Sequence, residues 1–135
     1  MTSFPLKIVT ADGLIFDGMA EKLIVRTVTG DMAVLARHIN CVCPLGMGRA
    51  VVEADGQRKT AACIGGMLNV FDGTVTLVPT TFEWADDIDL DRAQKAAKRA
   101  EETLAKRDTL TAHEIAIAEA RLKRALIREN VYQNK

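Results

Sequence analysis

The sequence has no excess of charge of either sign and no long apolar run. Eighteen Lys and Arg residues balance eighteen Asp and Glu residues, so the net positive charge that binds phosphates along a nucleic acid is missing. No apolar run approaches the roughly 20 residues that cross a bilayer, and the N-terminus lacks the basic and apolar regions of a signal peptide. We therefore expect a soluble, non-secreted protein that binds neither nucleic acid nor, by itself, a membrane.

Cysteine is scarce. The three cysteines, Cys41, Cys43 and Cys63, are an odd number without a framework spacing, which favours free thiols in a reducing cytoplasm over disulfides. His38 lies close to two of them in the sequence, but a structural zinc site wants four ligands in pairs, and of these donor types only Cys63 and His113 remain. Packing cysteines and no metal site are the expectation.

Glycine-rich phosphate loops are absent as well. Gly46, Gly48, Gly65 and Gly66 do not form the G-x-x-x-x-G-K-[ST] pattern, and we interpret them as turn and bulge residues. Without such a loop, the sequence predicts no independent ATPase activity.

What is present divides the chain near residue 84. The 135 residues, 48% of them hydrophobic, suit one ordinary domain or two small ones. Before residue 84, short β-rich runs alternate with turn dipeptides. The runs are "LKIV", "KLIVRTV", "RAVVEA", "RKTAACI" and "TVTLV", and the dipeptides, interpreted as hairpin turns, are Asp12-Gly13, Asp17-Gly18, Asp55-Gly56, Gly65-Gly66 and Asp72-Gly73. Strands so joined should pair antiparallel and bury their apolar faces sheet on sheet, which predicts a β-sandwich or flattened barrel over residues 1–84.

Residues 85–135 contain neither Gly nor Pro and are rich in helix-forming residues. We predict a first helix from Asp89, as N-cap, to about Lys106. A second helix opens at Thr111, where "TAHE" is a capping box with Glu114. The short "RDTL" segment between them allows only a sharp reversal. The predicted fold is thus α+β in two parts, an N-terminal antiparallel β-sandwich followed by a C-terminal antiparallel α-helical hairpin.

Alanines dominate the expected contact between the two helices. They recur with a few larger residues at spacings of three and four, as Leu90, Ala93, Ala97, Ala100 and Leu104 on the first helix and Ile115, Ala118, Leu122 and Ala125 on the second. A buried methyl contributes about 0.8 kcal/mol and a buried leucine about 1.5 to 3 kcal/mol, so this seam should be close-fitting and weak. Two readings stay open on composition: a permanently closed hairpin, and one that opens.

At this point the sequence resembles a known family, the ε subunits of bacterial rotary F-type ATP synthases. The resemblance rests on "FDGMAEKLIVRTVTGDMAVLARH", "IGGMLNVFDGTVTLV" and "DDIDLDRAQKAAKRAE", and it covers nearly the whole chain. The third stretch is the most specific, because "IDLDRA" matches the family's ATP-binding pattern Ile/Leu-Asp-x-x-Arg-Ala. One loop departs: this chain has "LARHINC" where the family commonly has Leu-Pro-Gly-His-Ala-Pro-Leu.

The resemblance implies a non-catalytic, regulatory subunit. In that family the sandwich packs on the γ subunit and the ring of membrane c subunits, and turns with the rotor, which couples ion flow to ATP synthesis. The hairpin permits ATP hydrolysis when folded and blocks it when extended along γ into the α/β catalytic head. The expected location is the cytoplasmic face of the cell membrane, reached only through the complex. An opening hairpin also explains why the seam is made of alanines.

Four arginines complete the picture. Arg92 and Arg99 are two turns apart on one helix, and Arg124 and Arg128 are one turn apart near the end of the other. In an antiparallel hairpin we expect them to converge at one end, where guanidinium groups suit polyphosphate. No cofactor is required, but the resemblance implies regulatory ATP there, bound by Glu83, Ile88, Asp89, Arg92, Ala93, Arg99, Arg124 and Arg128. In the extended state it implies inhibitory contacts with the catalytic subunits by Arg121, Lys123, Arg124 and Arg128.

Two alternatives remain at this stage. The arginines can simply be solvated or paired with neighbouring acids, as helix-surface charges usually are: Asp86, Asp87, Asp91 and Glu129. The chain can also be a stand-alone nucleotide sensor or small-molecule-binding protein instead of a rotor subunit. An exposed apolar face on the sandwich would favour the rotor subunit, which needs partners.

Overall fold

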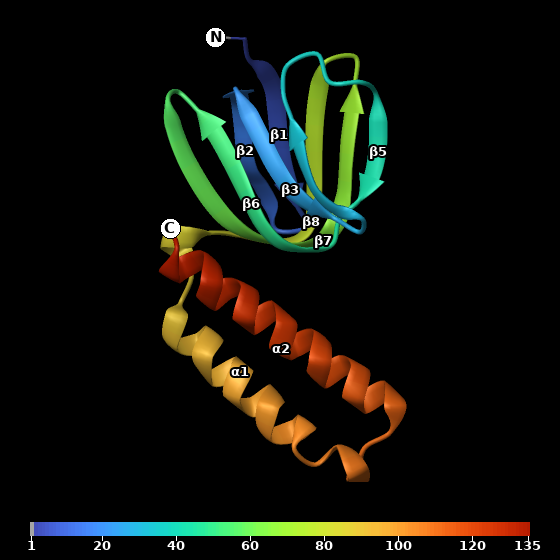
Figure 1. Ribbon diagram of the computed structural model, residues 1–135. Coiled ribbons are helices and arrows are strands. Elements are labelled where there is room, and N and C mark those ends of the chain that lie inside the picture. The colour runs from blue at the N-terminus through green and yellow to red at the C-terminus, as the bar shows by residue number, and fades with distance from the viewer. Residues whose placement is uncertain (1) are drawn as a thin grey trace. The chain divides into compact units, whose positions relative to one another are not determined.

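The computed structural model describes residues 2–135, and the chain divides into two compact units, residues 1–84 and 85–135 (Figure 1). Among the described residues, the regular elements of the first unit are strands and those of the second are helices. The strands are β1 (Phe4–Thr10), β2 (Gly13–Ala20), β3 (Lys22–Thr27), β4 (Gly30–Val34), β5 (Cys41–Pro44), β6 (Met47–Ala54), β7 (Gln57–Phe71) and β8 (Thr74–Trp84). The predicted fold class, a sandwich followed by a helical hairpin, is confirmed.

The strands form one hydrogen-bonded network that bends into two layers. Its order is β2-β1-β8-β7-β6-β3-β4, and β5 pairs with β7 off this path. The first half of β7 pairs with β6, and its second half pairs with β5. β7 therefore passes from one layer to the other along its own length, and β8 follows it on the other side.

This passage occurs at two glycines. Gly65 and Gly66 have φ values of +67° and +104°, which residues with a side chain rarely adopt. A Cβ on Gly66 would lie 2.6 Å from the Cα of Pro79 and still closer to the carbonyl oxygen of Val78. The prediction of a hairpin turn at Gly65-Gly66 is therefore wrong: the pair bends a continuous strand instead of ending it.

Two further sequence predictions need correction. Asp17-Gly18 is not a turn, because Asp17 pairs with Lys7 inside the β1–β2 ladder. The pairing is also not wholly antiparallel, since β1 and β8 run parallel; these strands come together by closure of the sandwich and not through a hairpin. The Asp-Gly turns at Asp12, Asp55 and Asp72 are confirmed. β2, β4 and β5 lie outside the example runs taken from the sequence, because their short apolar runs contain or adjoin turn residues.

Alternation of side chains along the strands builds the core of the sandwich. Inward positions of both layers contribute aliphatic side chains that are almost fully buried, among them Leu6, Ile8, Leu23, Val25, Leu68, Val70, Val75 and Leu77. Phe82 contacts Trp84 edge to face, with 4.9 Å between the ring centroids. The alternating pattern is the one expected of sheets that bury one face each.

The second unit is an antiparallel pair of helices, α1 (Leu90–Leu104) and α2 (Ala112–Gln133), with short 3-10 helices η1 (Ala85–Asp87) and η2 (Arg107–Thr109) before and between them. α1 ends two residues earlier than predicted. The predicted capping box is confirmed: the Thr111 hydroxyl accepts from the Glu114 amide at 3.1 Å, and the Thr111 amide donates to the Glu114 carboxylate at 3.2 Å. No helix within residues 2–135 is both long and apolar enough to cross a membrane.

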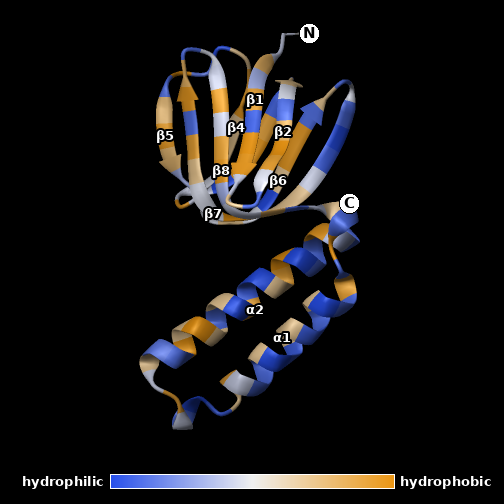
Figure 2. Cartoon of the chain, turned by 180° about the vertical axis from the view of Figure 1, so that it is seen from behind, coloured by the Kyte–Doolittle hydropathy of each residue, from blue (hydrophilic) through white to orange (hydrophobic). Residues whose placement is uncertain are grey.

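The alanine seam is confirmed. Ala93, Ala97 and Ala100 of α1 are buried, as are Ala118 and Ala125 of α2, while the larger seam residues are half-buried. The hairpin carries much less hydrophobic colour than the strands in Figure 2. The fully buried positions of the seam are therefore alanines, and each buried methyl contributes only about 0.8 kcal/mol.

Candidate functional site

The start of α1 is organised by the "IDLDRA" segment. Asp89 is the N-cap residue, and its carboxylate accepts a hydrogen bond from the Arg92 amide at 3.0 Å. This contact satisfies one of the free amides at the helix start. Ile88, just before the cap, is buried, and Ala93 lies in the seam. The segment thus has a complete structural role in ending the preceding turn and beginning the helix.

Three of the four arginines have the same sequence offset from a seam residue. Arg92, Arg99 and Arg124 each directly precede a buried seam alanine. A two-fold axis relates antiparallel helices, so the residue before a seam residue lies on the same face of the hairpin in both helices. Arg128, one turn beyond Arg124, also lies toward this face. We call these four residues the arginine face.

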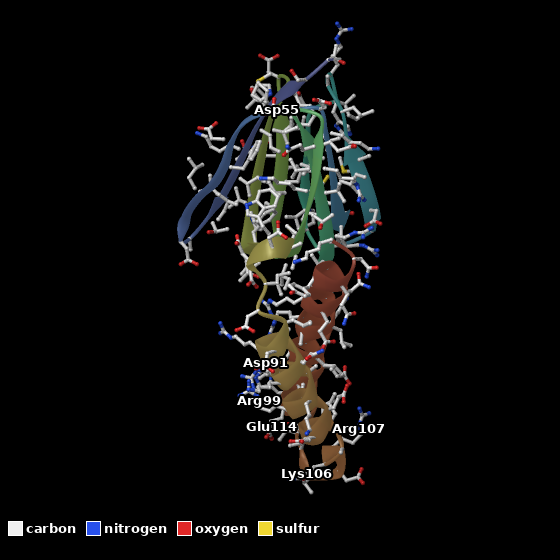
Figure 3. All side chains as sticks on the ribbon, turned by 90° about the vertical axis from the view of Figure 1, so that its left-hand side faces the viewer. Asp55, Asp91, Arg99, Lys106, Arg107 and Glu114 are labelled. Atoms are coloured by element: carbon white, nitrogen blue, oxygen red, sulfur yellow. The ribbon has the colours of Figure 1, made fainter. Side chains whose placement is uncertain are left out.

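The residues of the arginine face lie at different positions along the hairpin axis. Arg92 lies twelve residues before the end of α1 at Leu104, and Arg124 lies twelve residues after the start of α2 at Ala112. Equal distances from the turn place these two side by side. Arg99 lies seven residues nearer the turn than Arg92, roughly 10 Å along the axis at about 1.5 Å per residue. Figure 3 shows Arg99 on α1 between Asp91, nearer the start of the helix, and Lys106 at the turn end.

Two acidic residues near the arginine face, Asp91 and Asp86, form ion pairs with lysines. Asp91 forms an i,i+4 ion pair with Lys95 at 3.0 Å, and Asp86 pairs with Lys135 at 3.4 Å. The Lys135 ammonium also lies 4.1 Å from the centre of the Tyr132 ring. Within residues 2–135, the guanidinium groups of Arg92, Arg99 and Arg124 form no ion pair. Arg92 and Arg99 are exposed and Arg124 is half-buried, and the charges of all three are available to an anionic ligand.

The remaining predicted ligands fall in different places. Glu83 belongs to β8 in the sandwich unit, where it pairs with Ala62, whereas all the other residues belong to the helical unit. Of the residues expected to contact catalytic subunits, Arg121, Arg124 and Arg128 follow i, i+3, i+7 spacing and share one stripe of α2. Lys123 is exposed and lies about 200° around the helix from Arg121, off this stripe.

The three cysteines lie in two different environments, the core of the sandwich and its edge strand β5. Cys63 is buried, and burial raises the pKa of its thiol to about 12, so it is not a reactive residue. Cys41 and Cys43 are partly buried on β5. Within residues 2–135, no group of three or more His, Cys, Asp or Glu side chains is arranged to hold a metal ion.

An apolar face lies on the outside of one sandwich layer. Pro44, Met67 and Val78 are direct cross-strand neighbours on β5, β7 and β8, and Val42 and Phe71 project from the same side. Val42, Met67, Val78 and Phe71 are exposed by 64%, 42%, 46% and 68%. We call these five residues the apolar face. Sequence analysis did not locate this face. The signal was that "CVCPL" and "MLNVF" have apolar residues at both inward and outward positions of the strand, where an exposed strand face would normally be polar.

Comparison with known proteins gives a consistent result. Residues 3–85 match the family model of the ATP synthase Delta/Epsilon chain β-sandwich domain, and residues 86–133 match that of the Delta/Epsilon chain long α-helix domain. The chain is 40% identical to the ATP synthase epsilon chain of Bacillus velezensis over 134 residues, which is 99% of this chain and all of the relative. It is 39% identical to the ATP synthase epsilon chain of Caldanaerobacter subterraneus over 127 residues, 93% of this chain and 91% of the relative.

The fold is also similar to a chain in the cryo-EM structure of the Euglena gracilis mitochondrial ATP synthase. The TM-score is 0.82 at 25% identity, over 96% of this chain and 81% of that one. A chain in the central stalk and c-ring structure of the Tetrahymena thermophila enzyme gives a TM-score of 0.68 over 95% of each chain; at 12% identity this likeness concerns the fold alone.

Proposed function

The chain belongs to the delta/epsilon family of ATP synthase chains, which are non-catalytic subunits of the central stalk. From this we propose that it helps to couple ion flow to ATP synthesis and that it regulates ATP hydrolysis. The observation that carries the proposal is the match of both family domains, in order, over residues 3–133. Family membership favours this role over a stand-alone nucleotide sensor or other small-molecule-binding protein. The chain associates with the membrane through the complex, and we propose that it does so at the cytoplasmic face.

The apolar face supports docking of the sandwich onto the γ subunit and the c-subunit ring. Large apolar side chains that are contiguous on a sheet surface mark interaction sites more often than scattered ones do. Here three lie in direct cross-strand register, at Pro44, Met67 and Val78. Burying such a row at an interface removes its apolar area from water, at about 25 cal/mol per Å². We propose that this face makes the central contact with γ.

A charge placed in the apolar face tests the docking. Met67→Asp should weaken binding to γ by at least about tenfold, because an unpaired carboxylate would be buried at the interface. Leu35→Asp is the matched control, since Leu35 is 54% exposed in the segment after β4 and belongs to none of β5, β7 and β8. Binding is measured by calorimetry with purified γ. Equal affinities for the two variants would contradict docking through this face, and no binding by the wild type would contradict the rotor role.

The hairpin is suited to regulation. It is a separate compact unit, and the fully buried residues of its seam are alanines, each of which contributes little apolar area to the closed state. Once extended, α2 would present the positive stripe of Arg121, Arg124 and Arg128, with Lys123 beside it, to acidic segments of the α/β catalytic head. We propose that this contact blocks ATP hydrolysis.

Truncation of the hairpin tests the regulatory role. Removing residues 86–135 from the chain in the assembled complex should raise ATP hydrolysis or abolish its regulation, while ATP synthesis driven by an ion gradient persists. The comparison is made at several ATP concentrations, with and without the gradient. Unchanged hydrolysis under all of these conditions would contradict the hairpin's inhibitory role.

The arginine face supports binding of ATP to the closed hairpin. Only the closed form holds Arg92 and Arg124 side by side on facing helices, and planar guanidinium groups donate to phosphate oxygens in pairs. A ligand shifts an equilibrium only through its different affinity for the two states. We propose that ATP therefore favours the closed hairpin, and that Ile88, Asp89 and Ala93 of the same helical unit lie around the nucleotide.

Calorimetry on the isolated chain tests this site. Arg92→Ala and Arg124→Ala should each weaken ATP binding by about 1.5 to 3 kcal/mol, roughly ten- to a hundredfold, through loss of a charged donor. Lys98→Ala is the matched control: Lys98 follows the seam residue Ala97 by one position, so it lies on the opposite face of the same helix. Equal losses from Arg92→Ala and Lys98→Ala, or no wild-type binding at millimolar ATP, would contradict the site.

A further inference from the structure

Three sulfur atoms gather at the open edge of the sandwich. β4 pairs only with β3, and β5 pairs only with β7, so both are edge strands of the network. Cys41 and Cys43 alternate along β5 with the outward residues Val42 and Pro44 and therefore face inward. Together with Met32 of β4, both cysteines are partly buried against the core. The two edges of the sandwich thus approach one another through thiol and thioether groups.

The sulfur atoms have the separation of metal ligands. The Cys43 Sγ donates to the Met32 Sδ at 3.9 Å. Two sulfur atoms bound to one ion at about 2.3 Å, with a trigonal angle between them, would lie about 4.0 Å apart. Cys41 lies two residues before Cys43 on the same side of β5, and both are packed against the core. Alternation along β5 thus places both thiols on the side of the strand from which Cys43 reaches Met32.

The fourth nearby donor is partly occupied. The His38 Nδ1 lies 4.0 Å from the Cys41 Sγ and 2.9 Å from the carbonyl oxygen of Ile39. Because that carbonyl can only accept, Nδ1 carries the proton and is not a free ligand. The set is therefore two thiols and one thioether without a hard oxygen donor. This composition is unsuited to Mg²⁺ or Ca²⁺ and lacks the four donors of a structural zinc site.

We propose that Cys41, Cys43 and Met32 bind one soft monovalent ion of the Cu(I) and Ag(I) class in a three-sulfur site. On binding, the two S–H bonds break and two metal–thiolate bonds form, while the thioether donates a lone pair to the ion. Two protons leave to solvent, and no group is oxidised or reduced. Soft thiolate and thioether ligands select such ions. The site ties edge strand β4 to edge strand β5, so the bound ion stabilises the sandwich.

The test uses the full chain, reduced and free of oxygen, with Ag(I) as the redox-inert probe and Cu(I) as the second ion. Affinity is measured against a competing chelator, stoichiometry by native mass spectrometry, and coordination by X-ray absorption. The wild type should bind one ion with three sulfur neighbours, release two protons and show a higher melting temperature. Met32→Leu, close in volume, should reduce the sulfur shell to two and lower the affinity by at least about tenfold.

The thiols provide both the decisive variant and its control. Cys43→Ser should lower the affinity at least as much as Met32→Leu, and Cys41→Ser serves the same purpose if that variant does not fold. Cys63→Ala, at the buried thiol away from the edge, should leave affinity and coordination unchanged. The site is overturned if Cys63→Ala abolishes binding, if both edge serine variants bind like the wild type, or if Met32→Leu keeps three sulfur neighbours.

Discussion

The alanine seam leads to the sharpest prediction about the hairpin. Ala118 is buried in the seam, with 4% of its surface exposed, whereas Ala116 lies two residues earlier on the same helix and is exposed. Replacing either with Gly costs about 1 kcal/mol of helix stability. Only at Ala118 does the change also remove a buried methyl, which costs about 0.8 kcal/mol more. The pair separates contact across the seam from helix propensity.

The predicted effects are large enough to measure. Ala118→Gly should destabilise the folded hairpin by about 1.8 kcal/mol, roughly twentyfold in the equilibrium in which both helices unfold, and Ala116→Gly by about 1 kcal/mol, roughly fivefold. Native-state hydrogen exchange at the Ala97 and Ala100 amides reports the opening, because these amides lie on the helix that is not mutated. Exchange in the two variants should therefore differ by about fourfold.

Either of two results would refute this reasoning. Equal acceleration by both substitutions would mean that the seam methyls contribute nothing to closure, so that some other contact holds the helices. No acceleration at α1 by either substitution would mean that α1 and α2 do not open as one unit. A twentyfold effect from Ala118 alone, with none from Ala116, would instead contradict the helix-propensity part of the estimate.

Three further predictions concern the sandwich and the helix cap. Gly66→Ala should lower the free energy of unfolding by more than about 3 kcal/mol, because its Cβ would meet the backbone of Val78 and Pro79. Gly56→Ala, at φ +73° with no atom within 4 Å, should lower it by only about 1 kcal/mol. Denaturant unfolding followed by Trp84 fluorescence measures both, and similar losses would contradict the role of Gly66 in the passage of β7 between layers. Thr111→Ala should destabilise α2 by about 1 kcal/mol through loss of the capping box, seen as faster amide exchange in its first turn; unchanged exchange would exclude the cap as a stabilising contact. Burial raises the pKa of Cys63 from 9.0 to about 12. Between these two values the unfolded chain loses the thiol proton while the folded chain keeps it, so the stabilisation that is fully present below pH 9 is lost as pH rises toward 12. The free energy of unfolding should fall there by up to about 1.4 kcal/mol per pH unit. The unfolding free energy of Cys63→Ala should accordingly fall less steeply than that of the wild type across this range, and parallel curves would contradict the burial effect.

Local sequence determined much of this protein. The switch from turn-punctuated β-rich runs to a Gly- and Pro-free segment marked the boundary near residue 84, because strands and helices have different hydrophobic periods. Hydrogen bonds that close within a few residues were also readable, such as the Thr111–Glu114 capping box and the Asp89 cap. Of the candidate site, the spacing of the arginines relative to the seam alanines was already in the sequence, since offset from the seam fixes the helix face.

Tertiary structure decided whatever depends on residues far apart in the chain. The role of Gly65-Gly66 was set by the close approach of Val78 and Pro79, and a dipeptide that bends a strand looks locally like one that ends it. The Asp86–Lys135 ion pair, the parallel β1–β8 ladder and the approach of Met32 to Cys43 depend on closure of the hairpin and of the sandwich. Alternation and helical period specify which face a residue occupies, but only the packing of whole elements decides which residue lies opposite it.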